Sequence, residues 1–319
     1  HASAHDGIRM SKASAVFARH NDVQSFADLI AAFRAEGGTG RIWIAVETLY
    51  SMDGDMAPLT DLARLAASSG AMLLLDEAHG TGVFGPAGRG LSAGLDGLHN
   101  VITLHTCGKA MGGEGALICG PRIHIDYLIN RARPFIFSTA PSPLMAVAVA
   151  AALDRIEEAS DLRERLKILR QDAAEAICAP LGLPSPRSQI VPIILGEDSR
   201  AMAAAATLQE AGFDVRGIRP PTVPAGTSRL RISLTLNIGR ADVAALGREL
   251  QRIVGCASSS SPVRTRAAAR PSLPLDSPGR WARITGSRFR PGSIPMGTRK
   301  SWRACPACPP TASCPKPSG

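Results

Sequence analysis

The sequence contains few of the features that mark secreted, disulfide-stabilised or membrane proteins. Of its seven cysteines, only Cys107, Cys119 and Cys178 precede residue 256, and small or apolar residues flank them. This spacing builds no disulfide framework and suits a reducing compartment, so we expect a cytoplasmic protein. No apolar run reaches the roughly 20 residues of a membrane-spanning helix, and no signal peptide is visible. We therefore expect no membrane partner.

Most of the chain also lacks net positive charge. The formal net charge is +9, but residues 256–319 hold eleven Lys and Arg against one Asp. Residues 1–255 therefore carry a net charge of −1, which gives no electrostatic indication of nucleic-acid binding. We expect no nucleic-acid partner. The alternative, a nucleic-acid-binding module built on the basic tail, would show steeply salt-dependent binding.

The last 64 residues differ in character from the rest. Residues 256–319 contain eleven prolines, much Ser and Arg, and no hydrophobic periodicity, so we expect a disordered tail. Cys305 and Cys308 have the spacing of half a zinc site, but zinc normally needs four suitably spaced ligands and no His follows residue 124. We expect no metal site.

The chain begins at His1 rather than Met, and we expect a fragment that lacks an N-terminal portion.

Short apolar runs predict buried parallel strands. Residues 41–46, apolar after Arg41, and residues 71–75 are short apolar runs. Residues 59–69 between them have helical spacing, which gives a strand–helix–strand unit. Residues 101–104 and 115–119 add two strands. We therefore predict an α/β fold with a mostly parallel sheet, whose chemistry lies at the carboxyl ends of the strands. The polar residues that follow strands there are Glu47, Ser51, Asp76, His79 and Thr106.

The following sequence predicts a smaller C-terminal α+β domain. Residues 122–132 and 143–179 have helical patterns, the second with a break near Ser160. The elements expected next are a strand, a helix, a strand and a helix, at residues 190–195, 199–211, 230–234 and 241–254. The predicted units are a large domain, a small domain and the tail, over residues 1–165, 166–255 and 256–319.

Lys109 lies among small residues in Thr-Leu-His-Thr-Cys-Gly-Lys-Ala-Met-Gly-Gly (103–113), about thirty residues after Asp-Glu-Ala-His-Gly-Thr-Gly (76–82). An amine in this setting, downstream of an Asp and a His at strand ends, is what an aldehyde cofactor requires. The amine can bond to the aldehyde carbon of pyridoxal phosphate, and an Asp can keep the pyridine nitrogen protonated. The pattern therefore predicts pyridoxal 5′-phosphate as cofactor.

Several segments carry a family resemblance: Ser-Met-Asp-Gly-Asp (51–55), residues 76–82, Gly-Arg-Gly (88–90) and the Lys109 segment. Together they resemble the α-oxoamine synthases, pyridoxal-phosphate enzymes of the aspartate-aminotransferase fold (fold type I). The resemblance covers about residues 1–254. Ile-Arg-Pro-Pro-Thr-Val-Pro-Ala-Gly-Thr-Ser-Arg-Leu-Arg (218–231) and Arg-Ala-Arg-Pro-Phe-Ile-Phe-Ser-Thr (131–139) are most similar to the biotin-pathway branch.

The resemblance implies roles for individual residues. Lys109 would bind the cofactor aldehyde and act as general base, Asp76 would pair with the pyridine nitrogen, and His79 would hydrogen-bond the ring 3′-oxygen. The other residues expected at the cofactor are Ser51 near the 3′-oxygen, Thr106 at the phosphate, His1 stacked on the ring, and Ser138 and Thr139 at the phosphate of the other subunit of a homodimer.

Two further residues are expected at the substrate. Arg231 is our choice for the amino-acid carboxylate, because a guanidinium offers it a planar, two-pronged match. Arg229, two residues away, is the main rival. Thr222 lies in a loop expected near the bound substrate.

The resemblance implies an acyltransferase that condenses L-alanine with a pimeloyl thioester, of CoA or acyl-carrier protein, and releases carbon dioxide. The expected product is 8-amino-7-oxononanoate. One alternative is another α-oxoamine synthase, of the glycine C-acetyltransferase, 5-aminolevulinate synthase or serine palmitoyltransferase type. The other is an inactive truncated remnant, which pyridoxal-phosphate titration would identify.

Overall fold

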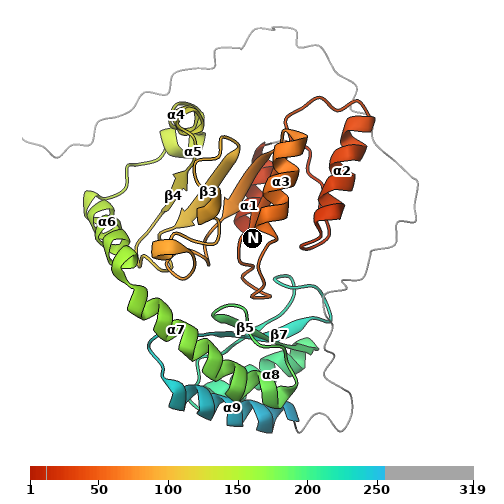
Figure 1. The fold of residues 1–319 in the computed structure, drawn as a ribbon. Coiled ribbons are helices and arrows are strands. Elements are labelled where there is room, and N and C mark those ends of the chain that lie inside the picture. The colour runs from red at the N-terminus through yellow and green to blue at the C-terminus, as the bar shows by residue number, and fades with distance from the viewer. Residues whose placement is uncertain (12, 256–319) are drawn as a thin grey trace, which may run out of the picture. The chain divides into compact units, whose positions relative to one another are not determined.

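The computed structural model describes residues 1–11 and 13–255. Within these residues the chain forms two β-sheets, each with helices packed against it (Figure 1). The predicted tail, with its basic residues and its cysteines, lies outside the described residues. In the described part of the chain, no helix is long and apolar enough to cross a membrane.

The first sheet has the order β1-β2-β3-β4. The strands β1 (Trp43–Glu47), β2 (Met72–Asp76) and β3 (Val101–Thr106) run parallel, and β4 (Ala116–Cys119) pairs antiparallel with β3. Glu47 and Asp76 are register partners at the carboxyl ends of β1 and β2. The parallel strands therefore bring their following loops to one edge of the sheet, as predicted.

Two helices, α2 (Val23–Ala35) and α3 (Leu59–Ser69), pack with this sheet, and α1 (Ala2–Ser11) precedes them. Leu62 and Ala66 are one turn apart on α3, so both reach the cluster formed by Leu73 and Leu75 of β2. The helix ends at Gly70, whose left-handed φ of 65° lets its N–H close the last turn on the Ala66 carbonyl. The chain then enters β2 directly.

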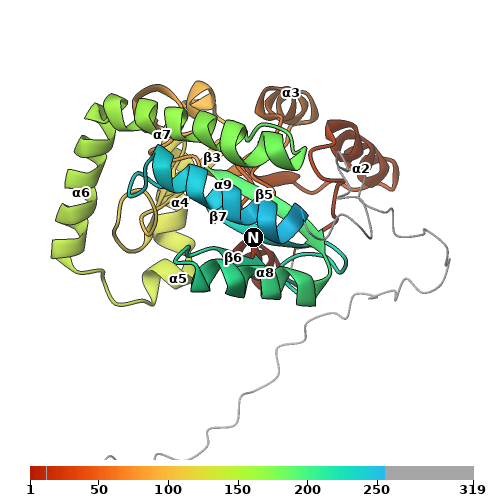
Figure 2. The ribbon, with the colours of Figure 1, turned by 90° about the horizontal axis from the view of Figure 1, so that it is seen from below.

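The second sheet has the order β5-β7-β6 and is antiparallel throughout. It consists of β5 (Ile190–Gly196), β6 (Arg216–Ile218) and β7 (Ser228–Ser233). Helices α7 (Ser160–Ala173), α8 (Asp198–Glu210) and α9 (Arg240–Gly255) pack with it (Figure 2). Leu230 and Ile232 on β7 alternate with Arg229 and Arg231, so one face of the strand joins the apolar core and the other carries cations.

The segment between the two sheets is helical. It contains α4 (Arg122–Arg131), α5 (Arg133–Ile136) and α6 (Pro143–Glu158), and α7 follows α6 almost directly. Short turns of helix lie at Pro86–Gly88, Ala93–Leu95, Ala174–Cys178 and Ala179–Leu181. The helix expected over 143–179 is thus interrupted at Ala159, next to the predicted break.

The predicted fold class is confirmed in its α/β character, its mostly parallel first sheet and its smaller second sheet. Sequence analysis missed β6, which has only three residues. The boundary between a large domain at 1–165 and a small one at 166–255 stays a prediction.

Candidate active site

Lys109 lies in a tight turn between β3 and β4, close to the carboxyl ends of β1 and β2. The turn is closed by backbone hydrogen bonds from Gly113 N to the Cys107 carbonyl (2.8 Å) and from Cys107 N to the Gly115 carbonyl (2.9 Å). Gly112 within it has a φ of 62°, which an L side chain adopts only with strain. The small residues around Lys109 therefore let the backbone turn back sharply and present the amine.

The amine of Lys109 is in an environment that favours its neutral form. Although the residue as a whole is exposed, burial around its amine lowers its pKa. Asp76 and Glu47 oppose this shift, and the Arg231 guanidinium adds to it. A neutral amine is the nucleophilic form, so this lysine is better suited than a solvated one to attack an aldehyde carbon.

His79 is close to the same charges. Burial, followed by the positive charges of Lys109 and Arg231, lowers the pKa of His79 to about 4, and Glu47 acts in the opposite direction. The imidazole is therefore neutral at pH 7, so each ring nitrogen is either a donor or an acceptor. Its backbone carbonyl accepts a 2.9 Å hydrogen bond from Gln189 Nε2, at the start of the second sheet.

The loop of residues 76–82 holds Asp76 and His79 in a compact turn. Asp76 Oδ1 accepts a hydrogen bond from Ala78 N at 2.9 Å. Gly80 packs so tightly that a Cβ there would lie 2.0 Å from Glu77 Oε2. Glu77 is fully buried and its Oε1 accepts from Ser92 N at 2.6 Å. Glu77 is thus a buried residue that packs against Gly80 of the loop and holds the Ser92 backbone.

Ser51 and Arg231 complete the group of residues that the structure brings together. Ser51 N donates to Glu47 Oε2 (3.3 Å), and the Ser51 carbonyl accepts from Arg231 Nε (2.6 Å). Arg231 Nη1 donates to Ser233 Oγ (2.7 Å). These contacts use two of the five N–H donors of the guanidinium, so one N–H of Nη1 and both of Nη2 are left for a two-pronged grip on a carboxylate.

Arg229, the rival for the substrate carboxylate, is 3% exposed. Its Nη1 donates to Asp53 Oδ1 at 2.6 Å and to the Met52 carbonyl at 3.1 Å. A buried guanidinium with an ion-pair partner of its own is poorly placed to receive a substrate. The structure therefore favours Arg231 over Arg229.

The remaining predicted residues differ in how far they join this group. His1 is exposed, but its terminal ammonium lies 2.8 Å from Glu47 Oε1 and its ring contacts Ser3 Oγ. Thr106 ends β3, three residues before Lys109, and accepts a long hydrogen bond from Gly108 N. Residues 138, 139 and 222 are exposed, and among the described contacts none links Ser138, Thr139 or Thr222 to Lys109.

Glu47 is a member of the group to which sequence analysis gave no role. It accepts from Ser51 N and from the chain terminus, and it raises the pKa of both Lys109 and His79. Its position at the end of the first strand, beside Asp76 in the sheet, was the feature that could have identified it as a site residue. Gln189 was missed as well, since nothing local predicts a contact with a loop 110 residues away.

The chemistry of these side chains fits pyridoxal phosphate. The group offers the Lys109 amine with its lowered pKa, the Asp76 carboxylate that interacts with this amine electrostatically, the neutral His79 ring and the Arg231 guanidinium. Among the described residues, Glu47, Asp76 and His79 do not bring their ligand atoms close enough together to hold a metal ion. Elsewhere in the described chain, ligand atoms of His20, Asp53 and Asp55 lie within 4.8 Å of one another. Asp53 is paired with Arg229 and Asp55 with His20, so we assign no ion there.

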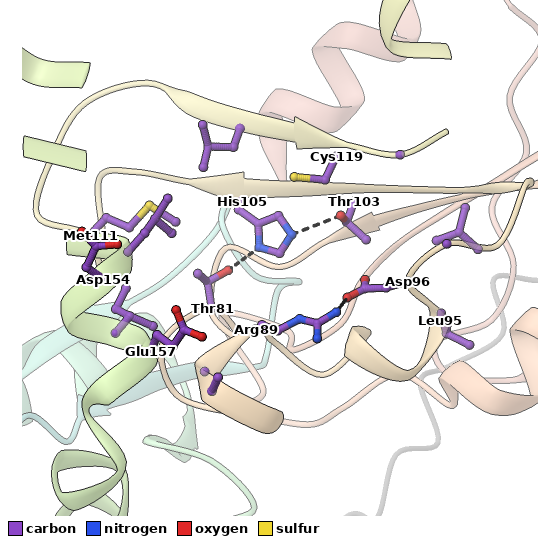
Figure 3. Close-up of a pocket in the computed structure, with 18 of the residues that line it drawn as sticks. Thr81, Arg89, Leu95, Asp96, Thr103, His105, Met111, Cys119, Asp154 and Glu157 are labelled. Carbon is purple, nitrogen blue, oxygen red and sulfur yellow. Dashed lines mark hydrogen bonds and ion pairs between the residues drawn. The ribbon is translucent and has the colours of Figure 1, made fainter. Parts of the chain in front are cut away.

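A separate cavity of about 510 Å³ lies beside the 76–82 loop (Figure 3). Its lining includes His105, which hydrogen-bonds Thr81 and Thr103, and the Arg89–Asp96 ion pair. None of Lys109, Asp76 and His79 lines it. The cavity is therefore distinct from the cluster around Lys109.

The chain is similar to known proteins in sequence and in fold. Residues 1–246 match the family model described as aminotransferase class I and II. The 8-amino-7-oxononanoate synthase of Anaeromyxobacter dehalogenans is 46% identical over 239 residues, which are 74% of this chain and 59% of that protein. The chain thus spans about three-fifths of the length of this curated relative.

Two solved structures resemble the fold. Serine palmitoyltransferase from S. paucimobilis, with a bound PLP–myriocin aldimine, has 27% identity and a TM-score of 0.73 over 81% of this chain and 65% of that one. An 8-amino-7-oxononanoate synthase from Francisella tularensis has 28% identity and a TM-score of 0.66, over 80% of this chain and 73% of that one.

These relatives confirm the resemblance to the α-oxoamine synthases. They also confirm, at the level of the family, pyridoxal phosphate as cofactor, because the matched serine palmitoyltransferase holds it. The family model covers well over half of the chain. The chain belongs to the aminotransferase class I and II family.

Proposed function

We propose that this chain acts in a pyridoxal-phosphate enzyme that condenses L-alanine with a pimeloyl thioester to form 8-amino-7-oxononanoate, a step of biotin biosynthesis. The observation that carries the proposal is the convergence of Lys109, Asp76 and His79 at the carboxyl ends of the first sheet. The 46% identity to an 8-amino-7-oxononanoate synthase supports the choice of product.

The cofactor, when bound, would supply an electron sink for the charge that develops at the substrate α-carbon. Lys109 would hold its aldehyde carbon, and the Asp76 carboxylate would keep a proton on its ring nitrogen. The neutral His79 ring would share a hydrogen bond with the 3′-oxygen, to which Ser51 is also assigned. Thr106 would donate its hydroxyl to the phosphate, with His1 at the face of the ring.

The freed amine of Lys109 would then take the proton from the α-carbon of alanine, because its lowered pKa favours the neutral, basic form of the amine. Arg231 would hold the substrate carboxylate and so orient the α-hydrogen toward this amine. The α-carbon displaces the thiol of the thioester, carbon dioxide leaves, and a proton returns to the carbon. Amino acid and acyl thioester thus give aminoketone, thiol and carbon dioxide.

Three partner assignments belong to the same proposal: an amino acid, an acyl-CoA or acyl-carrier-protein thioester, and a second copy of the chain. Thr139, with Ser138, would reach the cofactor phosphate of that second copy, and Thr222 would approach the bound substrate. The exposure of residues 138, 139 and 222 is compatible with contacts to groups from outside the chain.

Substrate competition tests the proposal. The full chain, saturated with pyridoxal phosphate, is incubated with pimeloyl-CoA and with alanine, glycine or serine, and products are identified by mass spectrometry. We expect 8-amino-7-oxononanoate from alanine at a rate at least about tenfold above the products from the other two, which is the discrimination that a pocket achieves for one small group more or less. Faster use of glycine or serine would assign the chain to another α-oxoamine synthase type, and no product from any of them would indicate an inactive remnant.

A further inference from the structure

The loop between β1 and α3 is held by a buried cation from the second sheet. Arg229 is 3% exposed and donates through Nη1 to Asp53 Oδ1 (2.6 Å) and to the Met52 carbonyl (3.1 Å), while its Nε donates to the Thr227 carbonyl (3.0 Å). A guanidinium stays charged, so its burial requires these partners. The contact therefore fixes this loop, which we call the Ser51 loop (residues 51–55), to β7.

The same loop has no room to shift toward β5. A Cβ on Gly54 would lie 2.4 Å from the Ile190 carbonyl oxygen, and the φ of Gly54 is 68°. The fully buried Ser188 donates from Oγ to the Gly54 carbonyl at 2.9 Å. The tip of the Ser51 loop thus packs tightly against β5, and Asp53 in the same loop forms an ion pair with Arg229 of β7.

The loop begins inside the candidate active site. Ser51 is 9% exposed, and it is held between Glu47 Oε2, which accepts from its N–H, and Arg231 Nε, which donates to its carbonyl. Arg229 and Arg231 lie on the same face of β7, so the two guanidinium groups hold neighbouring residues of the loop. A shift of Asp53 would therefore move Ser51 and change the partners of Arg231.

We propose that the Arg229–Asp53 ion pair is a positioning element of the active site, which sets Ser51 and Arg231 relative to Lys109. Neither Arg229 nor Asp53 is assigned a contact with cofactor or substrate; both act by holding the Ser51 loop. The proposal rests on the proposed function, since Ser51 and Arg231 are assigned to cofactor and substrate. Arg229, expected from the sequence only as a rival to Arg231 for the substrate carboxylate, thereby gains a role in holding the site.

The test uses the full chain with pyridoxal phosphate as the probe. Asp53→Asn removes the charge but keeps the shape of a side chain that is 37% exposed, and Arg229→Lys keeps the charge but loses the fork of donors. Arg252→Gln, in an exposed ion pair on α9, is the matched charge control. Leu250→Ala removes a fully buried side chain on the same helix and controls for general loss of stability.

We expect Asp53→Asn and Arg229→Lys to raise the dissociation constant of pyridoxal phosphate about tenfold, a loss of about 1.4 kcal/mol of binding free energy, because Ser51 is no longer held in place. We also expect them to shift the pH midpoint of the absorbance of the bound cofactor. Arg252→Gln and Leu250→Ala should leave that midpoint unchanged, because neither touches the loop. Asp53→Asn is the decisive variant if Arg229→Lys fails to fold.

Failure of this inference can be separated from failure of the proposed function. If the unmodified chain gives no borohydride-stable pyridoxyl group on Lys109, the proposed function fails, and this inference fails with it. If the unmodified chain does give it, and Asp53→Asn has the dissociation constant and pH midpoint of the two controls, only the positioning role is overturned. Loss of fold by Asp53→Asn would also overturn it, since the pair would then be a folding determinant.

Discussion

At the scale of single residues, sequence alone could predict the functional side chains that come directly after strands. Asp76, His79 and Lys109 were found because each comes directly after a short apolar run or within a Gly-rich turn. The burial of Arg229 could not be predicted, because it depends on Asp53, 176 residues away. Sequence alone left Arg229 and Arg231 as rivals two residues apart, and only tertiary contacts separate their roles.

His79 gives a prediction for the pH dependence of stability. Its pKa is lowered from 6.5 to about 4 in the folded chain, so between these values the unfolded chain binds a proton that the folded chain does not. Stability due to this group is complete above pH 6.5 and is lost as the pH falls toward 4. His79→Gln removes that dependence, and the urea midpoint should fall less between pH 7 and pH 5 in the variant. Equal decreases in both proteins would contradict the assignment.

At the scale of elements, the long periodic segments were predicted and the short or interrupted ones were not. The helix at 59–69 and its exit at Gly70 agree with α3, because leucine spacing and a left-handed glycine are both local signals. The strand β6 has three residues, too few for a pattern to emerge, and it forms because β7 lies beside it. The turn at Ala174–Cys178, where α7 widens, likewise has no local signal.

Gly247 on α9 tests the packing of that element. Alanine normally stabilises a helix interior relative to glycine, but a Cβ at position 247 would lie 2.2 Å from the Ala176 carbonyl oxygen. We therefore expect Gly247→Ala to lower the free energy of unfolding by about 1–3 kcal/mol through overpacking. Gly7→Ala, on α1 with nothing within 4 Å of the added carbon, is the control and should not destabilise. A stabilising effect of Gly247→Ala in urea unfolding would show that α9 packs less closely.

At the scale of the whole molecule, the described chain has two large apolar clusters, one with each sheet. We propose the domain boundary near residue 165 on this basis, together with the tail from residue 256. Leu73 and Leu208 are fully buried, one in each cluster. Each Leu→Ala substitution should cost about 2–5 kcal/mol.

Hydrogen exchange can show which part of the chain loses stability in each Leu→Ala variant. In Leu73→Ala we expect faster exchange in peptides from β2 and β3, and in Leu208→Ala in peptides from β5 and β7, because each cavity weakens its own cluster. Mass spectrometry of peptic fragments provides the measurement. Equal acceleration across both sheets in both variants would mean that the described chain unfolds as one unit, and the proposed boundary would be wrong.

The central claim for the whole molecule is that one of its five lysines, Lys109, bonds to the cofactor aldehyde. The most direct measurement is borohydride reduction of the full chain in pyridoxal phosphate, followed by peptide mapping, with Lys109→Ala and Lys167→Ala as paired variants. The account predicts a pyridoxyl group on Lys109 at stoichiometric amounts, lost in Lys109→Ala and retained in Lys167→Ala. Labelling spread over the other lysines, or unchanged in Lys109→Ala, would contradict it.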